Sequence, residues 1–294
     1  MGTKGAGAES RGSEQMLKIY ILAENRTLRK DMQAEHGLSI LVEYDGFRVL
    51  FDTGQKDIFA QNARTAGIDL ATVDALVISH GHYDHAGGVP EFCRLNKKAP
   101  LYIHPDAFGE KYIARHGRPA SASIGIPWSC GNKNSYLDRM IFVREPLKIH
   151  KNILLSGEVS RNSIKKKIST GLIKKTAAGT YEKDAVLDEQ FLLIQGKKGY
   201  YLIVACSHQG ILNCLAYARQ LSCGAKIYGL IGGLHLERYS KEKLQQLVAD
   251  FKAAGIEMVI PLHCTKSQAY QLLQDYFGDN CLLLNSGDEL VLEK

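Results

Sequence analysis

The chain has 294 residues, of which 45% are hydrophobic and 23% charged, and its formal net charge is +6. This composition excludes a disordered or fibrous protein and predicts a globular one with a sizeable core. The charge is too small for a nucleic-acid-binding surface, and no uncharged apolar run reaches the roughly 20 residues of a membrane span. We therefore expect that the protein binds neither nucleic acid nor a membrane. The seven cysteines form an odd set without close pairs, which indicates reduced thiols and a cytoplasmic location.

The first half of the chain predicts strands and helices in alternation. Residues 1–15 carry Gly, Ser and charge without an apolar stretch, so we expect a disordered tail before a single domain over 16–294. A strand over 17–22 precedes a hairpin whose strands, 38–44 and 47–51, are joined by Asp45-Gly46. Further along the chain, the pattern predicts helices over 58–68, 86–96 and 105–116, and strands over 74–79 and 101–104.

Regular patterning fades over 118–188, which we interpret as an irregular basic insertion because nine Lys or Arg lie between Lys148 and Lys183 against two acids. The second half then repeats the order of the first. It predicts a hairpin around Gly196–Gly199, helices over 211–221, 241–254 and 267–277, and strands over 226–231, 258–261, 281–284 and 289–293. Two similar halves predict an α/β fold in which two sheets pack face to face with helices outside, a four-layer αββα arrangement.

Three imidazoles and a carboxylate follow directly after the apolar strand over 74–79. They form the run His-x-His-x-Asp-His, made of His80, His82, Asp84 and His85. Neutral imidazole nitrogens and carboxylate oxygens are good ligands for zinc, and also for iron or manganese. Gly87 and Gly88 remove side chains where the backbone must pass close to such a site. The spacing therefore predicts a metal-binding loop.

This motif resembles the signature of the metallo-β-lactamase superfamily. More narrowly, FDTGQ (51–55), ACSHQGILN (205–213), IGGLHL (231–236) and PLHCT (261–265) resemble the subgroup named for dihydropterin-ribofuranosylaminobenzene-phosphate synthase. The resemblance implies one or two divalent metals, with zinc expected and iron or manganese as alternatives. It also implies that His80, His82 and His208 bind the first metal, and that Asp84, His85 and His263 bind the second.

One feature departs from the superfamily, which usually supplies a bridging Asp between the last two histidines. The chain has no Asp at that place, and His235 occupies the neighbourhood, so a site with a single metal stays an alternative. We expect Asp84 and His235 to be catalytic, with His235 acting as a ligand, a general acid or a phosphate contact. Three further residues are expected to orient a ligand or contact substrate, namely Asp52, Arg161 and Glu237.

Two cysteines adjoin the candidate histidines. Cys206 precedes His208 by two residues and Cys264 follows His263 directly, so either thiolate could reach a metal. We interpret both as small buried side chains, which is the commoner role of a free cysteine.

The metal loop and the basic segment together favour a metallohydrolase that uses metal-activated water on a small anionic, phosphate-bearing substrate. One alternative is a transferase that condenses a dihydropterin diphosphate with an arylamine, in which Tyr83, Phe108, Tyr112 or Trp128 would line a flat pocket. Another is a non-catalytic metal-binding sensor or scaffold. The sequence leaves the oligomeric state open.

Overall fold

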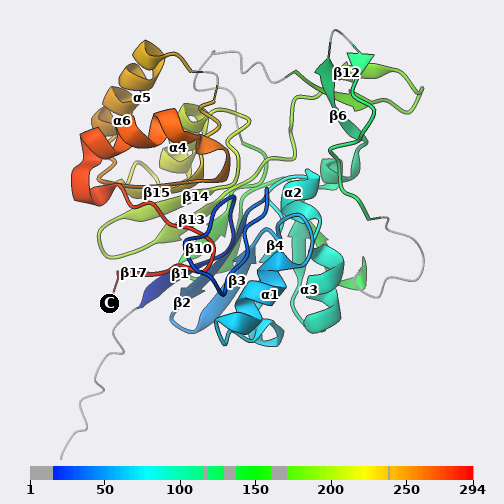
Figure 1. The fold of residues 1–294 in the computed structure, drawn as a ribbon, viewed down its shortest axis with the longest axis horizontal. Coiled ribbons are helices and arrows are strands. Elements are labelled where there is room, and N and C mark those ends of the chain that lie inside the picture. The colour runs from blue at the N-terminus through cyan, green and yellow to red at the C-terminus, as the bar shows by residue number, and fades with distance from the viewer. Residues whose placement is uncertain (1–15, 116–117, 129–136, 160–170, 238, 294) are drawn as a thin grey trace, which may run out of the picture.

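The computed structural model describes residues 16–115, 118–128, 137–159, 171–237 and 239–293. Within these ranges, two large sheets lie face to face and helices cover their outer sides (Figure 1). The predicted tail over 1–15 and the candidate substrate contact Arg161 lie outside the described residues. None of the described helices combines the length and the apolar composition that crossing a membrane requires.

The first sheet begins with the predicted hairpin. Asp45 and Gly46 adopt positive φ angles of 50° and 83° in its turn, as a tight hairpin requires. Strands β2 (Ser39–Tyr44) and β3 (Phe47–Phe51) pair antiparallel, and the strands after β3 add in parallel, so their C-terminal ends lie on the same edge. In spatial order the strands are β17 (Glu289–Glu293), β1 (Leu17–Ala23), β2 (Ser39–Tyr44), β3 (Phe47–Phe51), β4 (Ala75–Val77), β5 (Leu101–Ile103) and β8 (Met140–Phe142).

The second sheet is built largely by the second half of the chain. Its strands β14, β15 and β16 are parallel neighbours, so the loops that follow them leave the same edge. In spatial order the strands are β16 (Met258–Leu262), β15 (Ile227–Gly233), β14 (Tyr200–Val204), β13 (Leu192–Gln195), β10 (Ile153–Leu155) and β9 (Leu147–His150).

Three hydrophobic clusters separate the layers. The middle one lies between the sheets and includes Phe51 and Val42 of the first sheet with Ile203 and Ile260 of the second. An outer cluster packs α1 (Ile58–Thr65) and α3 (Val89–Leu95) on the first sheet. The other packs α4 (Ile211–Leu221), α5 (Lys241–Ala253) and α6 (Ser267–Phe277) on the second. The predicted four-layer αββα fold is therefore confirmed.

Two predicted elements are wrong. The helix expected over 105–116 is a 3₁₀ turn at Pro105–Phe108 followed by β6 (Lys111–Arg115). β6 forms a strand because it pairs with β11 (Leu172–Lys175), and because Lys111 turns inward to two aspartates. The strand expected over 281–284 is a single bridge from Cys281 to Val259, since the chain there leaves the second sheet and crosses to β17 in the first.

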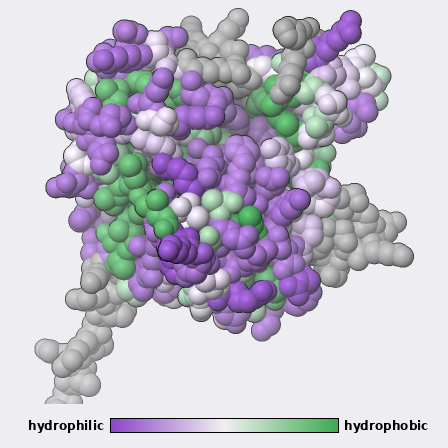
Figure 2. Space-filling model, viewed as in Figure 1, coloured by the Kyte–Doolittle hydropathy of each residue, from purple (hydrophilic) through white to green (hydrophobic). Residues whose placement is uncertain are grey.

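The described part of 118–188, where we expect irregular structure, contains short strands. β8 extends the first sheet, while β9 and β10 extend the second. A small third sheet, made of β6, β7 (Arg118–Pro119), β11 and β12 (Tyr181–Lys183), projects from the two-sheet body in Figure 1. Most of these strands have two to four residues, too few to show an alternating pattern in the sequence. The face drawn in Figure 2 is mainly hydrophilic, with a hydrophobic area near β17.

Candidate metal centre

Four loops meet at one end of the two sheets. The first follows β4, contains His80 and His82, and leads into α2 (Tyr83–Ala86), which carries Asp84 and His85. The other three follow the parallel strands β14, β15 and β16 and carry His208, His235 and His263 respectively. The strand ends therefore place histidines from distant parts of the chain together.

The first group consists of His80, His82 and His208. One ring nitrogen from each lies within 4.8 Å of the others, and His80 Nε2 lies 2.9 Å from His82 Nδ1. Two ligands of a tetrahedral zinc are about 3.3 Å apart, so this spacing fits one ion. Among the described residues, buried His82 Nε2 and both ring nitrogens of His208 lack hydrogen-bond partners. Such orphaned atoms are costly, and a metal would satisfy part of this group.

Burial keeps this group uncharged. It lowers the pKa of His82 to about 3, and burial with neighbouring histidines holds the pKa values of His80 and His208 well below their usual range. All three imidazoles are thus neutral at pH 7, the form that binds metal.

The second group surrounds Asp84. Asp84 Oδ2 lies 3.5 Å from His263 Nε2, 3.8 Å from His85 Nε2 and 3.2 Å from His36 Nε2. Burial opposes the charge on Asp84, yet His85, His263 and His36 hold its pKa well below the usual range. Burial also opposes the charge on His85, but Asp84 and Asp52 raise the pKa of His85 to about 9. Without a metal, this group is therefore a compact ion pair.

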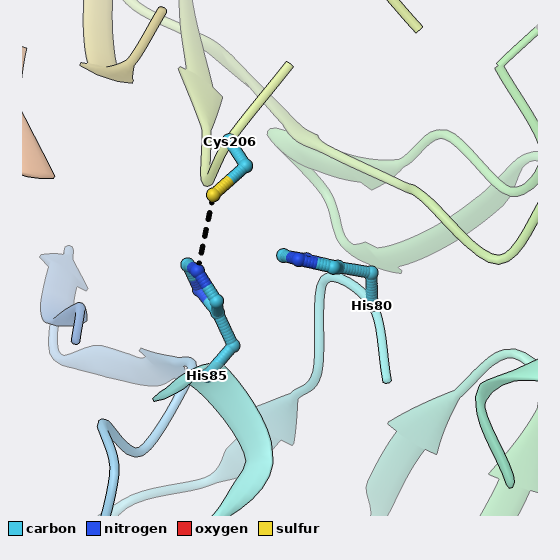
Figure 3. A group of neighbouring side chains, drawn as sticks. All are labelled: His80, His85 and Cys206. Carbon is cyan, nitrogen blue, oxygen red and sulfur yellow. Dashed lines mark hydrogen bonds between the residues drawn. The ribbon is translucent and has the colours of Figure 1, made fainter. Parts of the chain in front are cut away.

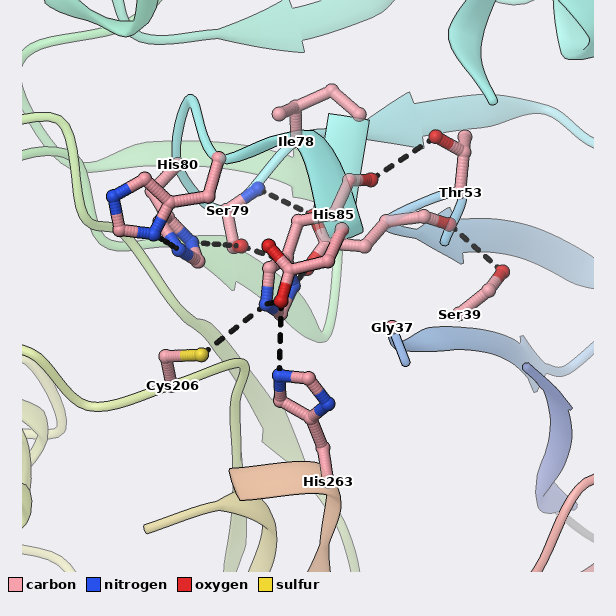
Figure 4. Close-up of polar contacts among 12 residues, drawn as sticks. Gly37, Ser39, Thr53, Ile78, Ser79, His80, His85, Cys206 and His263 are labelled. Carbon is pink, nitrogen blue, oxygen red and sulfur yellow. Dashed lines mark hydrogen bonds and ion pairs between the residues drawn. The ribbon is translucent and has the colours of Figure 1, made fainter. Parts of the chain in front are cut away.

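One carboxylate orients a histidine of each group. Asp52 Oδ2 lies 2.7 Å from His85 Nδ1 and accepts a hydrogen bond from Ser79 Oγ, which in turn lies 2.8 Å from His80 Nδ1 (Figure 4). A carboxylate can only accept hydrogen bonds, so His85 carries a proton on Nδ1. The Ser79 hydroxyl gives its single proton to Asp52, so it can only accept a hydrogen bond from His80 Nδ1. Both Nε2 atoms are left facing the centre. Asp52 is fully buried and also accepts from the Ser79 backbone N–H.

Three other buried carboxylates hold the backbone of the histidine loops. Glu189 accepts from the N–H groups of His208 and Gln209, both at 2.6 Å, and Glu24 accepts from His263 N–H at 2.8 Å. Burial raises the pKa of Glu189 to about 7, although the two N–H donors act to lower it. Burial also raises the pKa of Glu24. The third, Asp188, accepts from Gly81 N–H and pairs with Lys111 of the third sheet. The centre is thus preorganised by its surroundings.

The two glycines predicted to allow close backbone passage do so. A Cβ on Gly87 would lie 2.0 Å from the Gln55 carbonyl oxygen, and one on Gly88 would lie 2.3 Å from that of Lys56. Nearby, Asp52, His235 and His263 have φ angles of 62°, 50° and 51°. Such left-handed conformations cost about 1–2 kcal/mol each for non-glycine residues and cluster at functional sites.

His235 lies at the rim of the centre. Its ring centroid is 4.7 Å from that of His208, its Nδ1 is buried without a partner among the described residues, and its Nε2 lies 3.9 Å from Glu237 Oε1. Glu237 also pairs with Lys266, and both line an open pocket of about 490 Å³ with residues 265–269. The structure therefore places His235 beside the first group of histidines, and Glu237 next to His235. The third candidate, Arg161, lies outside the described residues.

Comparison with known proteins shows the family to which the chain belongs. A family model described as the metallo-beta-lactamase superfamily matches residues 33–161. A crystal structure of a metal-dependent hydrolase of the β-lactamase superfamily is 31% identical, with a TM-score of 0.79, and covers 95% of this chain and 100% of its own. The chain belongs to the metallo-β-lactamase superfamily.

Other relatives extend the comparison over most of the chain. An uncharacterized protein of Methanocaldococcus jannaschii is 35% identical over 254 residues, which are 85% of this chain and 91% of the relative. From the same organism, 7,8-dihydropterin-6-methyl-4-(beta-D-ribofuranosyl)-aminobenzene-5'-phosphate synthase is 27% identical over 292 residues, covering 94% and 97%. A metallo-β-lactamase fold protein of Bacillus subtilis, 11% identical with a TM-score of 0.55 over 95% and 100% of the two chains, shares the fold.

Proposed function

We propose that this protein is a metal-dependent hydrolase that acts on a small, phosphate-bearing anion. The observation that carries the proposal is the first group, in which one ring nitrogen each of His80, His82 and His208 converge, and both buried ring nitrogens of His208 have no hydrogen-bond partner among the described residues. The second group, with Asp84 and His263, adds a carboxylate and a further imidazole next to it. Together they suit two zinc ions, with iron or manganese as alternatives and a single ion as the smaller possibility.

The chain would divide the chemistry between metal and side chains. A divalent metal, when bound, supplies a Lewis acid and lowers the pKa of a coordinated water toward about 7. Burial opposes the charge on His235, but Cys264 and Glu237 outweigh it and raise the pKa of His235 above its usual value, which favours its protonated form. His235 would donate that proton to the leaving oxygen as a general acid. Asp84 would hold a metal and accept a hydrogen bond from His36, whose Nε2 lies 3.2 Å from its Oδ2.

The pocket beside His235 is the proposed substrate entrance. It is lined by Lys266, whose Nζ lies 3.5 Å from Glu237, and by the first residues of α6. An ammonium group in the lining of a pocket favours an anionic substrate. The pocket volume of about 490 Å³ suits a small molecule.

A transferase that acts on a dihydropterin diphosphate is the second candidate, and the named synthase relative favours it. Phe108 and Trp128 pack edge to face with ring centroids 5.8 Å apart, and Trp128 Nε1 donates to the Ala86 carbonyl at the end of α2. A planar ring could bind beside this aromatic pair. Tyr112 instead contacts Tyr181 on the third sheet.

One series of assays distinguishes the hydrolase from the transferase. Zinc-loaded protein is incubated either with an aryl phosphodiester or with a dihydropterin diphosphate plus an aminobenzene phosphate. The proposal expects phosphodiester hydrolysis that is lost in His208→Ala and kept in Asp31→Asn, whose side chain pairs with Arg29 on the surface. Condensation without hydrolysis would favour the transferase. Metal binding with neither reaction would favour a sensor or scaffold.

A further inference from the structure

Cys206 lies among imidazoles rather than among apolar side chains. It follows β14 directly after Ala205, it is 4% exposed, and its Sγ lies 3.2 Å from His85 Nε2 (Figure 3). Sγ is also within 4.8 Å of one ring nitrogen from each of five histidines, namely His80, His85, His208, His235 and His263. Cys206 is buried, as the sequence leads us to expect, but its neighbours include five imidazoles, an environment that filling space does not require.

The sulfur also lies between the two groups of candidate ligands. His80 and His208 belong to the first group and His263 to the second, yet all three lie within 4.8 Å of the same Sγ. An atom with this position could contact a metal in either place, or one in each. No Asp between His208 and His263 other than Asp250 occurs in the sequence, and Asp250 lies in α5, outside the centre.

Charge balance favours an anionic ligand at this point. Two divalent ions bring four positive charges, whereas the imidazoles are neutral ligands and Asp84 supplies one negative charge. Buried charge must be compensated nearby. A thiolate would add a second negative charge where the two groups meet, and sulfur is a ligand that zinc accepts readily.

We propose that the Cys206 thiolate is a metal ligand shared between the two groups, in the place where a bridging carboxylate was expected. This inference rests on the proposed metal-dependent function. On metal binding the Cys206 S–H bond breaks, its proton goes to solvent, and a sulfur–metal bond forms without any change of oxidation state. Cys264 is the matched comparison, because its Sγ lies within 4.8 Å of Cys206 Sγ and of a His263 nitrogen, but the groups that include it contain no histidine of the first group.

The test uses the full-length chain loaded with cobalt(II), whose thiolate complexes have a near-ultraviolet charge-transfer band. Wild type, Cys264→Ser and Cys223→Ser, the last at an exposed position, should show the band. Cys206→Ser should lose it, and its bound cobalt should fall from about two ions to about one, held by the three histidines of the first group. A disulfide between Cys206 and Cys264 in the metal-loaded protein, or a band that is lost in Cys264→Ser instead, would overturn the proposal.

A second measurement needs no variant, in case Cys206→Ser does not fold. X-ray absorption of zinc-loaded wild type should reveal sulfur at about 2.3 Å from zinc. A zinc shell of nitrogen and oxygen alone would overturn the role of Cys206 while leaving the metal site intact. If the chain binds neither cobalt nor zinc, the proposed function itself fails.

Discussion

Replacing Asp52 by Asn tests whether one buried carboxylate orients both metal positions. Oδ2 accepts from Ser79 Oγ and from His85 Nδ1, and an Asn amide group placed there would face two donors. Hydrogen bonds to a charged group contribute about 1.5–3 kcal/mol each, and breaking a buried pair costs about 3–5 kcal/mol. Because Asn also tolerates the φ angle of 62° at this position, no backbone strain is added. We therefore expect Asp52→Asn to lower the free energy of unfolding by about 3–5 kcal/mol.

The same substitution should weaken metal binding. An Asn amide donates to His85 Nδ1, which moves the ring proton to Nε2, the atom that faces the centre. Loss of such an orienting partner lowers metal affinity about 10- to 100-fold. Urea denaturation of the metal-free protein and zinc competition with a chelator measure the two effects, and the exposed Asp31→Asn serves as control. Stability within about 0.5 kcal/mol of wild type, together with unchanged zinc affinity, would refute the assigned role of Asp52.

Four further predictions concern His85, Lys111 and Gly87. Zinc must displace a proton from His85, whose pKa is about 9, so zinc affinity at the second group should rise at least about tenfold per pH unit from 7 to 9; an affinity independent of pH would contradict this. Because the folded-state pKa of His85 is raised, its contribution to the stability of the metal-free protein is complete below about pH 6.5 and is lost as the pH rises through 9, which urea denaturation can follow. Lys111→Met should destabilise the protein by about 3–5 kcal/mol, since it leaves two buried aspartates without their cation, whereas Lys175→Met, which removes an exposed ion pair, should leave the stability close to that of wild type. Gly87→Ala should destabilise the protein by about 1–3 kcal/mol in thermal unfolding, because its Cβ meets a carbonyl oxygen at 2.0 Å; a neutral effect would show that the loop can shift.

The sequence predicts those parts of the centre that follow a strand or share a motif. The run from His80 to His85 is dense enough to recognise, and the positions of His208 and His263 after apolar strands bring them to the same edge as the motif. His36 has no such signal, since it lies in the loop before β2 and meets Asp84 only through tertiary packing.

Glu24 and Glu189, and the ring of imidazoles around Cys206, were also out of reach of sequence patterns. Periodicity indicates which residues are buried, but it does not show whether a buried residue contacts apolar groups, backbone N–H groups or imidazoles. The contacts of Glu189 with the His208 loop and of Cys206 with His85 join residues 19 and 121 positions apart in the chain. The third sheet was missed for a related reason, because its short strands are specified by pairing and by the buried Lys111 pair.

The metal content of the purified chain, measured by elemental mass spectrometry on wild type and His208→Ala after reconstitution with zinc, tests the central claim most directly. The account predicts about two ions per wild-type chain and the loss of at least one in the variant, because His208 completes the first group. A wild-type chain that retains no metal, or a variant that retains as much as wild type, would contradict it.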